Sequence, residues 1–362
     1  MTSKIIANGI LRAIGILVLI GLLLYFIYEI QSVIAYILIA AVISLLGKPI
    51  VDFLHEKLKF RNLLAVIVTM LLFLGIFTGI ISLLVPLLLE QGQNLSLLDI
   101  DELRGNIEGL YIQLIDYLQL HNINANKAIS DSKILSNLDY GAIPDFLNSL
   151  ISGLGSFSIG LLSVLFIAFF FLKDSTLFRN GILTFVPKHN ELRVKHSLLQ
   201  ISHLLSRYFV GLFFQIFILF IIYTIGLLII GAENAVVIAF LCALVNIIPY
   251  IGPLIGGILM IFLVTTDNLV ADFETVVLPK LFFTLIVILI GQLVDNFFSQ
   301  PYIFSKSVKS HPLEIFLIII IAGLLFGVVG MIVAVPAYTA LKVILKEFLS
   351  QYKVVKILTR GI

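Results

Sequence analysis

Long apolar runs without a charged residue are the feature that most restricts what this chain can fold into. A helix rises about 1.5 Å per residue and the hydrocarbon core of a bilayer is about 30 Å thick, so about 20 apolar residues can cross it. Five charge-free runs and a sixth that contains Asp295 are read as single spans: 13–28, 30–47, 63–89, 149–172, 208–232 and 281–298. The sequence therefore predicts an all-α polytopic membrane protein with about six full spans.

Composition agrees with this class and excludes others. Only 12% of the residues are charged, about half the share of a soluble domain, and a net charge of +2 argues against a nucleic-acid partner. The single cysteine, Cys242, excludes an intrachain disulfide and a thiolate metal cluster. The motifs G-x-x-x-x-G-K-[ST], H-E-x-x-H and G-x-S-x-G do not occur. The sequence thus predicts neither an ATP-driven pump nor an enzyme, and no cofactor or metal.

Basic residues accumulate in the cytoplasmic loops of membrane proteins, and their distribution orients this chain. Lys4 and Arg12 precede the first span, the loop 48–61 carries four basic residues, and 173–207 carries six. The stretch 90–148 has nine acids against three basic residues, which suits the outside. These counts predict cytoplasmic termini and an extracytoplasmic insertion, and apolar residues at steps of three and four within 100–118 predict that this insertion is helical.

Two further apolar stretches, 234–266 and 315–341, are broken by proline and glycine. As one straight helix the first would be about 50 Å long, too long for the bilayer. Each stretch is either a kinked full span or a re-entrant helical hairpin. Hairpins would put the acidic loop 267–280 outside and Lys306 and Lys309 inside, so charge asymmetry favours them. The residues expected at the hairpin tips are Pro249, Tyr250, Gly252, Pro253 and Gly256 in the first stretch, and Gly327, Gly330 and Pro336 in the second.

With hairpins, the second half of the chain becomes an inverted repeat of a span followed by an interrupted helix. Such pairs indicate the midplane site of a secondary transporter, because broken helices expose backbone groups that can bind solute or ions. The same residues could instead be structural bends with small-residue packing. The predicted organisation is three helices (1–89), an extracytoplasmic segment (90–148), a fourth span (149–172), an amphipathic cytoplasmic linker helix (173–207), a transport core (208–346) and a basic cytoplasmic tail (347–362).

Asp295 is the main candidate for ion coupling. An acidic residue inside an apolar span is costly in lipid, so it usually faces protein or water and handles ions or protons. Gln292, Asn296 and Gln300 share a polar stripe with it at helical spacing. The alternative is an aspartate at the headgroup level that only caps its helix. Asn246, just before the first tip, is a further candidate.

Ordered motifs lie between residues 150 and 346: Phe169-Phe-Phe-Leu-Lys173-Asp174, Asn246-Ile-Ile-Pro-Tyr-Ile-Gly-Pro-Leu-Ile-Gly256, Asp295-Asn296, Pro301, His311-Pro312-Leu313 and Phe326-Gly327-Val-Val-Gly330-Met-Ile-Val-Ala-Val-Pro336. Together these motifs resemble the autoinducer-2 exporter (AI-2E) family of bacterial permeases. The resemblance implies a homo-oligomeric inner-membrane protein that exports small solutes such as the quorum-sensing signal autoinducer-2. It also implies cation and proton exchange for some members. Where the family often has Gly-Gln early in its fifth span, this chain has Gly211-Leu212, and the nearest glutamine, Gln215, is a further candidate for ion coupling.

The leading hypothesis is a secondary permease of the bacterial inner membrane that moves a small polar solute and is coupled to a proton or cation. Its expected partners are lipid, the solute, the coupling ion and further copies of the chain. A cation/proton antiporter and a passive oligomeric channel are the alternatives. A non-transporting scaffold that binds partners through 90–148 is a further one.

Overall fold

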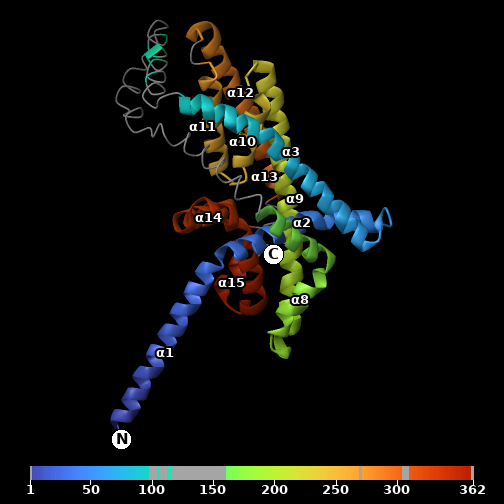
Figure 1. The fold of residues 1–362 in the computed structure, drawn as a ribbon, viewed down its shortest axis with the longest axis vertical. Helices are drawn as coiled ribbons and strands as arrows, with labels where there is room; N and C mark the ends of the chain where they lie inside the picture. The colour runs from blue at the N-terminus through green and yellow to red at the C-terminus, as the bar shows by residue number, and fades with distance from the viewer. Residues whose placement is uncertain are drawn as a thin grey trace. The chain divides into compact units, whose positions relative to one another are not determined.

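The computed structural model describes residues 2–97, 160–268, 271–303 and 310–359, with a few single positions between 105 and 117 (Figure 1). Every regular element in these ranges is helical. The chain forms two compact units: residues 1–70 with 157–178, and residues 71–156 with 179–362. Most of the predicted extracytoplasmic segment, the start of the fourth span, Lys306 and Lys309 lie outside the described residues.

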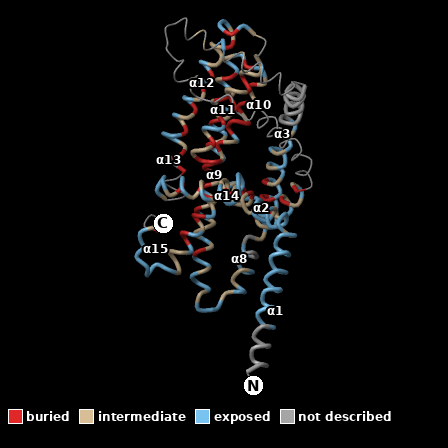
Figure 2. The backbone as a smooth tube through the Cα atoms, turned by 90° about the vertical axis from the view of Figure 1, so that its left-hand side faces the viewer, coloured by how far each residue is buried: buried red, intermediate tan, exposed pale blue. Residues whose placement is uncertain are grey.

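The first unit contains α1 (Thr2–Glu29), α2 (Gln31–Glu56), the start of α3 (Asn62–Leu97) and the helix Gly160–Lys173. Its core consists of Val51, Ala65, Val66 and Leu172. The Asn62 amide donates a hydrogen bond to the carbonyl of Lys173 over 3.3 Å, which ties α3 to the end of that helix. Every side chain from Leu11 to Glu29 in α1 is exposed within this chain, as Figure 2 shows.

The second unit is built on α9 (Glu191–Ile230), which follows α8 (Ser175–Thr184) and the short helix η1 (Lys188–Asn190). Its 40 residues correspond to a rise of about 60 Å. Residues 191–207 of the predicted linker and the predicted span from 208 therefore share one continuous helix, whereas α8 and η1 form the earlier part of the linker. It ends at Gly231, whose φ of 69° lies in the left-handed region that glycine adopts without strain.

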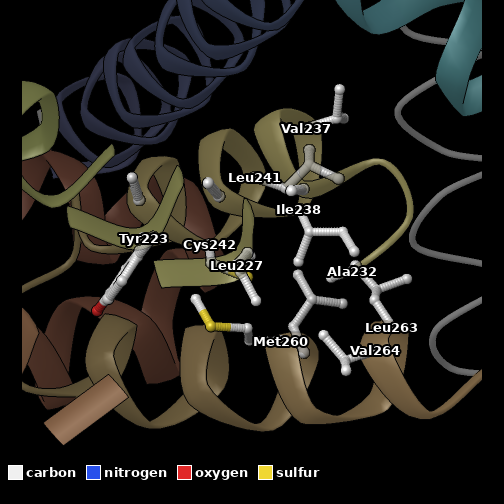
Figure 3. Packing of buried hydrophobic residues seen from close by; sticks show 14 of the residues in the cluster. Tyr223, Leu227, Ala232, Val237, Ile238, Leu241, Cys242, Met260, Leu263 and Val264 are labelled. Carbon is white, nitrogen blue, oxygen red and sulfur yellow. The ribbon is translucent and has the colours of Figure 1, made fainter. Parts of the chain in front are cut away.

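The first interrupted stretch folds back on itself as α10 (Ala235–Val245) and α11 (Ile251–Thr266), named hairpin 1 here. A Cβ atom on Gly252 would overlap the carbonyl of Val245, and one on Gly256 would lie 3.0 Å from the carbonyl of Cys242. As the residue number rises along α11, the number of the residue it contacts falls along α10, so the two arms are antiparallel. Figure 3 shows Met260, Leu263 and Val264 of α11 packed against Ile238 and Cys242 of α10.

Tyr250 forms the tip of hairpin 1 in a strained conformation. Its φ and ψ are 67° and −45°, and the amide of Ile251 donates to the carbonyl of Pro249 over 2.8 Å, which closes a three-residue γ-turn. A non-glycine residue in such a region costs about 1–3 kcal/mol and persists only when its surroundings fix it. The Tyr250 ring packs edge-on against Phe316, with centroids 5.8 Å apart.

The second interrupted stretch, α14 (Pro312–Leu349), also doubles back and is named hairpin 2 here. Its chain reverses at Gly327, where φ is 63° and ψ is −151°. The Tyr338 hydroxyl donates to Glu314 over 2.9 Å although the two residues are 24 apart, and a straight helix would separate them by about 36 Å. The arms are 312–326 and 328–349, so neither interrupted stretch is a helix that merely bends and continues.

Six of the described helices are long and apolar enough to cross a membrane, and five of these match predicted spans. They are Leu11–Glu29, Gln31–Glu56, Asn62–Gly79, Lys188–Ile230 and Phe273–Ser299, with Pro312–Leu349 as the sixth. The sixth is hairpin 2, and the length and hydropathy that qualify it belong to its two arms taken together. Of the predicted span 149–172, the structure describes Gly160 onward. An all-α polytopic membrane protein is thereby confirmed.

The remaining helices follow α11. The π-helix η2 (Phe273–Val277) leads into α12 (Leu278–Val294), then the π-helix η3 (Asp295–Ser299) and α13 (Gln300–Ile303), and α15 (Lys353–Leu358) follows α14. Asp272 caps η2 by accepting hydrogen bonds from the Thr275 hydroxyl and amide, over 2.6 and 2.9 Å. These bonds, chiefly that of the hydroxyl, hold the pKa of Asp272 below its ordinary value.

Replacing Gly327 with alanine should destabilise hairpin 2. The φ/ψ pair at this residue belongs to a region that only glycine occupies readily, so any side chain there costs about 1–3 kcal/mol. We expect a lower melting temperature of the detergent-solubilised protein, measured by fluorescence-detected size-exclusion chromatography. Gly181→Ala is the matched control, because Gly181 lies in helix α8 with open space where a Cβ would be. Equal melting temperatures for the two variants would contradict the assigned turn.

Candidate functional site

The candidate site lies where α9, α12 and hairpin 1 pack together, and small residues permit the close approach. A Cβ on Gly226 would overlap Val287, and one on Gly291 would overlap the ring of Tyr223. Without a side chain at position 291, the Tyr223 ring lies directly against the backbone of α12. Leu219, Tyr223 and Leu227 of α9 are buried in the same apolar cluster as Cys242 and Met260.

Asp295 is fully buried, at 0% exposure. It begins η3, a single π-helical turn between α12 and α13, and such turns occur often at functional sites because they redirect side chains. The Gln300 amide donates to Asp295 Oδ2 over 2.8 Å and to Asn296 Oδ1 over 3.1 Å. The side chains of Gln215 and Ser299 also face this carboxylate. Asp295 is therefore enclosed by protein.

Tyr223 links this carboxylate to the end of hairpin 1. Its hydroxyl accepts a hydrogen bond from the Gln292 amide over 3.1 Å and faces the side chains of Asn246 and Asp295. Asn246, exposed by only 1%, directly follows α10 and donates to the carbonyl of Cys242 over 2.8 Å. The polar groups of α9, α12 and hairpin 1 thus converge around one phenol.

Two buried oxygen atoms at this site accept no hydrogen bond within the described residues: Asp295 Oδ1 and Asn246 Oδ1. Leaving a buried acceptor unpaired costs about 1–3 kcal/mol, and more for a charged group. Native proteins keep such atoms mainly where a ligand, an ion, a proton or water completes them. The site is consequently suited to a group that brings positive charge or hydrogen-bond donors.

The predicted candidates divide into two sets. The structure brings together Gln215, Asn246, Gln292 and Asp295, whereas Asn296 is exposed and touches the group only through Gln300. Pro249 and Tyr250 form the turn of hairpin 1, and Gly252, Pro253 and Gly256 lie in the first turns of α11. Gly327 is the exposed turn of hairpin 2, Gly330 packs against Ala322, and Pro336 lies well inside the second arm.

Tyr223 was not predicted from the sequence, and neither was a second polar cluster formed by Ser310, Glu314, Tyr338 and Lys342. Tyr223 appears in the sequence as one aromatic residue of an apolar span, and its role becomes visible only once Gly291 is opposite it. Glu314 and Lys342, 28 residues apart, form an ion pair of 3.3 Å. The midpoint between these two positions in the sequence lies next to Gly327. Opposite charges placed evenly on either side of a tip residue could therefore have predicted this ion pair.

Comparison with known proteins agrees with this architecture. The sequence model of the protein family described as AI-2E family transporter matches residues 14–350. This chain belongs to that family. YueF and YrrI of Bacillus subtilis (strain 168), both named as candidate transport proteins, are similar to it. YueF is 28% identical over 361 residues, covering 93% of this chain and 89% of YueF. YrrI is 26% identical over 355 residues, covering 93% of this chain and 95% of YrrI.

Membership in the AI-2E family supports a multi-pass permease-type transporter. MJ1177 of Methanocaldococcus jannaschii, with the same kind of name, is 23% identical over 335 residues, or 90% of this chain and 91% of MJ1177. The match includes α9 to α14 and therefore the convergence around Asp295. In a family of transporters, a buried carboxylate is first considered as a binding or coupling group rather than as a catalyst.

Proposed function

We propose that this protein is a secondary transporter that moves a small polar solute, such as autoinducer-2, across the bacterial inner membrane and is coupled to a proton or cation. The unit that contains α9 to α14 carries the site, and the first three helices act as scaffold in a homo-oligomer. Coupling requires one group whose protonation or ion occupancy changes between two states. Asp295 is the proposed group.

The observation that carries this proposal is the Asp295 carboxylate, which is fully buried and has one oxygen atom that accepts no hydrogen bond from the described residues. It lies between a long helix, a broken helix and a helical hairpin, which are the parts that transporters place around a midplane site. Gln215, Asn246 and Gln292 supply the neighbouring polar contacts. The unpaired oxygens of Asp295 and Asn246 favour a second candidate, exchange of a cation for protons, by the same site.

The proposal includes a topology in which the two hairpins are re-entrant from opposite faces and both termini are cytoplasmic. Glu274 would then face outside and Ser350 inside, and both are exposed. In a Cys242→Ala background, Glu274→Cys should react with an impermeant maleimide added to intact cells, and Ser350→Cys only in inverted vesicles. Labelling of both from the same side would overturn this topology.

The transport proposal is tested with the purified full-length protein in proteoliposomes. We expect the vesicles either to release loaded autoinducer-2 or to dequench a pH-sensitive dye when sodium or potassium chloride is added. In either assay the flux should saturate and should require an imposed pH gradient. Gradient-independent single-channel currents would assign a passive oligomeric channel instead. Absence of any flux, in protein that remains folded, would favour a scaffold.

A further inference from the structure

The turn that joins α2 to α3 alternates basic and apolar residues: Lys57-Leu58-Lys59-Phe60-Arg61. All five residues are exposed. The three basic side chains form no ion pair and no hydrogen bond with any residue that the structure describes. The turn therefore presents positive charge that the described part of the chain leaves unmatched.

Hydrogen bonds fix the backbone of this turn to both helices. The Phe60 amide donates to the carbonyl of Leu54 over 3.1 Å, and His55 Nδ1 lies 2.8 Å from the carbonyl of Phe60. Because a carbonyl only accepts, the imidazole nitrogen is the donor of that bond. On the other side, the Ala65 amide donates to the carbonyl of Arg61 over 3.0 Å, which starts α3. The basic residues are thus carried by one defined backbone conformation.

Lys59, in the middle of the turn, has a strained backbone. Its φ of 54° lies in the left-handed region, where glycine is free of strain and a residue with a Cβ atom is not. Such residues persist where their surroundings fix them, and they gather at binding and catalytic sites. The turn thus carries a charged side chain at the one position where its backbone favours none.

Acidic neighbours reduce the positive charge around the turn but do not cancel it. Four basic and two acidic residues lie in 48–61, which leaves a net charge of +2. The acids, Asp52 and Glu56, are exposed and lie one turn apart on α2. The helix that is bonded to the start of α3 ends in Lys173 and Asp174, whose charged groups lie 4.0 Å apart and offset each other. The surplus charge therefore belongs to the turn.

The turn lies at the edge of the predicted hydrocarbon region, because the apolar run of α3 begins at Leu63, two residues after Arg61. Leu58 and Phe60 are 52% and 38% exposed. At this depth, apolar side chains enter the acyl boundary while lysine and arginine extend toward the phosphates. The alternation of the two kinds of residue suits both layers of one lipid.

We propose that the α2–α3 turn binds the headgroup of an anionic phospholipid. Lys57, Lys59 and Arg61 donate to its phosphate oxygens, and such charge-assisted bonds favour a lipid with net negative charge over a zwitterionic one. Leu58 and Phe60 contact the upper acyl chains of the same lipid. The site lies in the first unit of the chain and does not depend on what the protein transports.

The test uses the absence of tryptophan from this chain. Phe60→Trp places a single fluorophore in the turn of the full-length protein, which is reconstituted in vesicles of equal parts phosphatidylglycerol and phosphatidylcholine. One lipid at a time is brominated on its acyl chains, and bromine quenches tryptophan on contact. We expect brominated phosphatidylglycerol to show a relative affinity at least about fivefold higher, the effect of one basic residue near an anionic surface.

Matched variants separate this site from a general enrichment of anionic lipid. Phe26→Trp reports from an exposed position in the same unit, three residues before Glu29, and both brominated lipids should quench it equally. In the Phe60→Trp background, Lys59→Gln should lower the preference several-fold, and replacing all three basic residues with glutamine should remove it. Lys353→Gln, which neutralises an exposed lysine on α15, should leave the preference unchanged.

Four outcomes would overturn the proposal. Equal quenching of folded Phe60→Trp by the two lipids would mean that the turn does not select charge, and quenching by neither would mean that protein, such as a second copy of this chain, covers it. A preference that survives the triple glutamine variant would assign the selection to other residues. Loss of the preference on adding inorganic phosphate, at an ionic strength matched with chloride, would show that the turn takes free phosphate. If Phe60→Trp does not fold, Leu58→Trp supplies the same readout.

Discussion

Asp295→Asn should lower gradient-driven flux in proteoliposomes at least about tenfold, equivalent to about 1.4 kcal/mol in the rate-limiting step. Asparagine has nearly the same shape as aspartate but neither binds a proton nor carries charge at any working pH, so the group that couples the gradient is lost. Folding should survive, because a buried carboxylate is replaced by a neutral amide. The Gln300 amide can still donate to the remaining side-chain oxygen.

The control for this change is Asp272→Asn, which makes the same substitution outside the buried site. Asp272 is exposed and its carboxylate is used in capping η2, so flux should stay within about twofold of the parent. Both variants are compared at equal reconstituted amounts, with folding checked by size-exclusion chromatography. Full gradient-driven flux in Asp295→Asn would show that Asp295 is not the coupling group. The proposal that the protein is a transporter would still stand.

The doubled-back form of both interrupted stretches could be predicted from the sequence because backbone chemistry limits the choices. Proline and glycine interrupt both charge-free runs and disfavour one continuous helix in each, and the charges of the flanking loops then favour hairpins over kinked spans. The position of the second turn was less specified, since 323, 327, 330 and 336 are all helix breakers. Only Gly327 has the backbone conformation that reverses the chain.

The candidate site could be predicted only in part. The spacing of Gln292, Asp295 and Gln300 suggested one polar face, and the structure joins Gln300 to Asp295. The π-helical turn that encloses Asp295 leaves no clear sequence pattern, and Tyr223 lies in a mostly apolar span. Contacts between elements, such as Tyr223 with Gln292 over 3.1 Å, depend on packing that a single sequence does not specify.

The role of Tyr223 leads to the second large effect, a loss of flux on Gly291→Ala. The added methyl group would overlap the Tyr223 ring, so the ring must move away from α12 and its hydroxyl must leave Gln292. Overpacking of this kind costs about 1–3 kcal/mol. Because the same hydroxyl faces Asn246 and Asp295, we expect flux to fall about tenfold or more, together with a lower melting temperature.

Gly257→Ala separates this effect from a general response to alanine in a membrane helix. A Cβ on Gly257 would lie 3.6 Å from Ile288 Cγ2, an ordinary contact, and alanine favours a helix over glycine by about 1 kcal/mol. This variant should be at least as stable as the parent and retain its flux. Tyr223→Phe in the Gly291→Ala background then tests the cause: if displacement of the hydroxyl explains the loss, removing that hydroxyl as well should produce little further decrease. A large additional loss would show that Tyr223 still serves the site from its displaced position, and that Gly291 matters for helix packing alone.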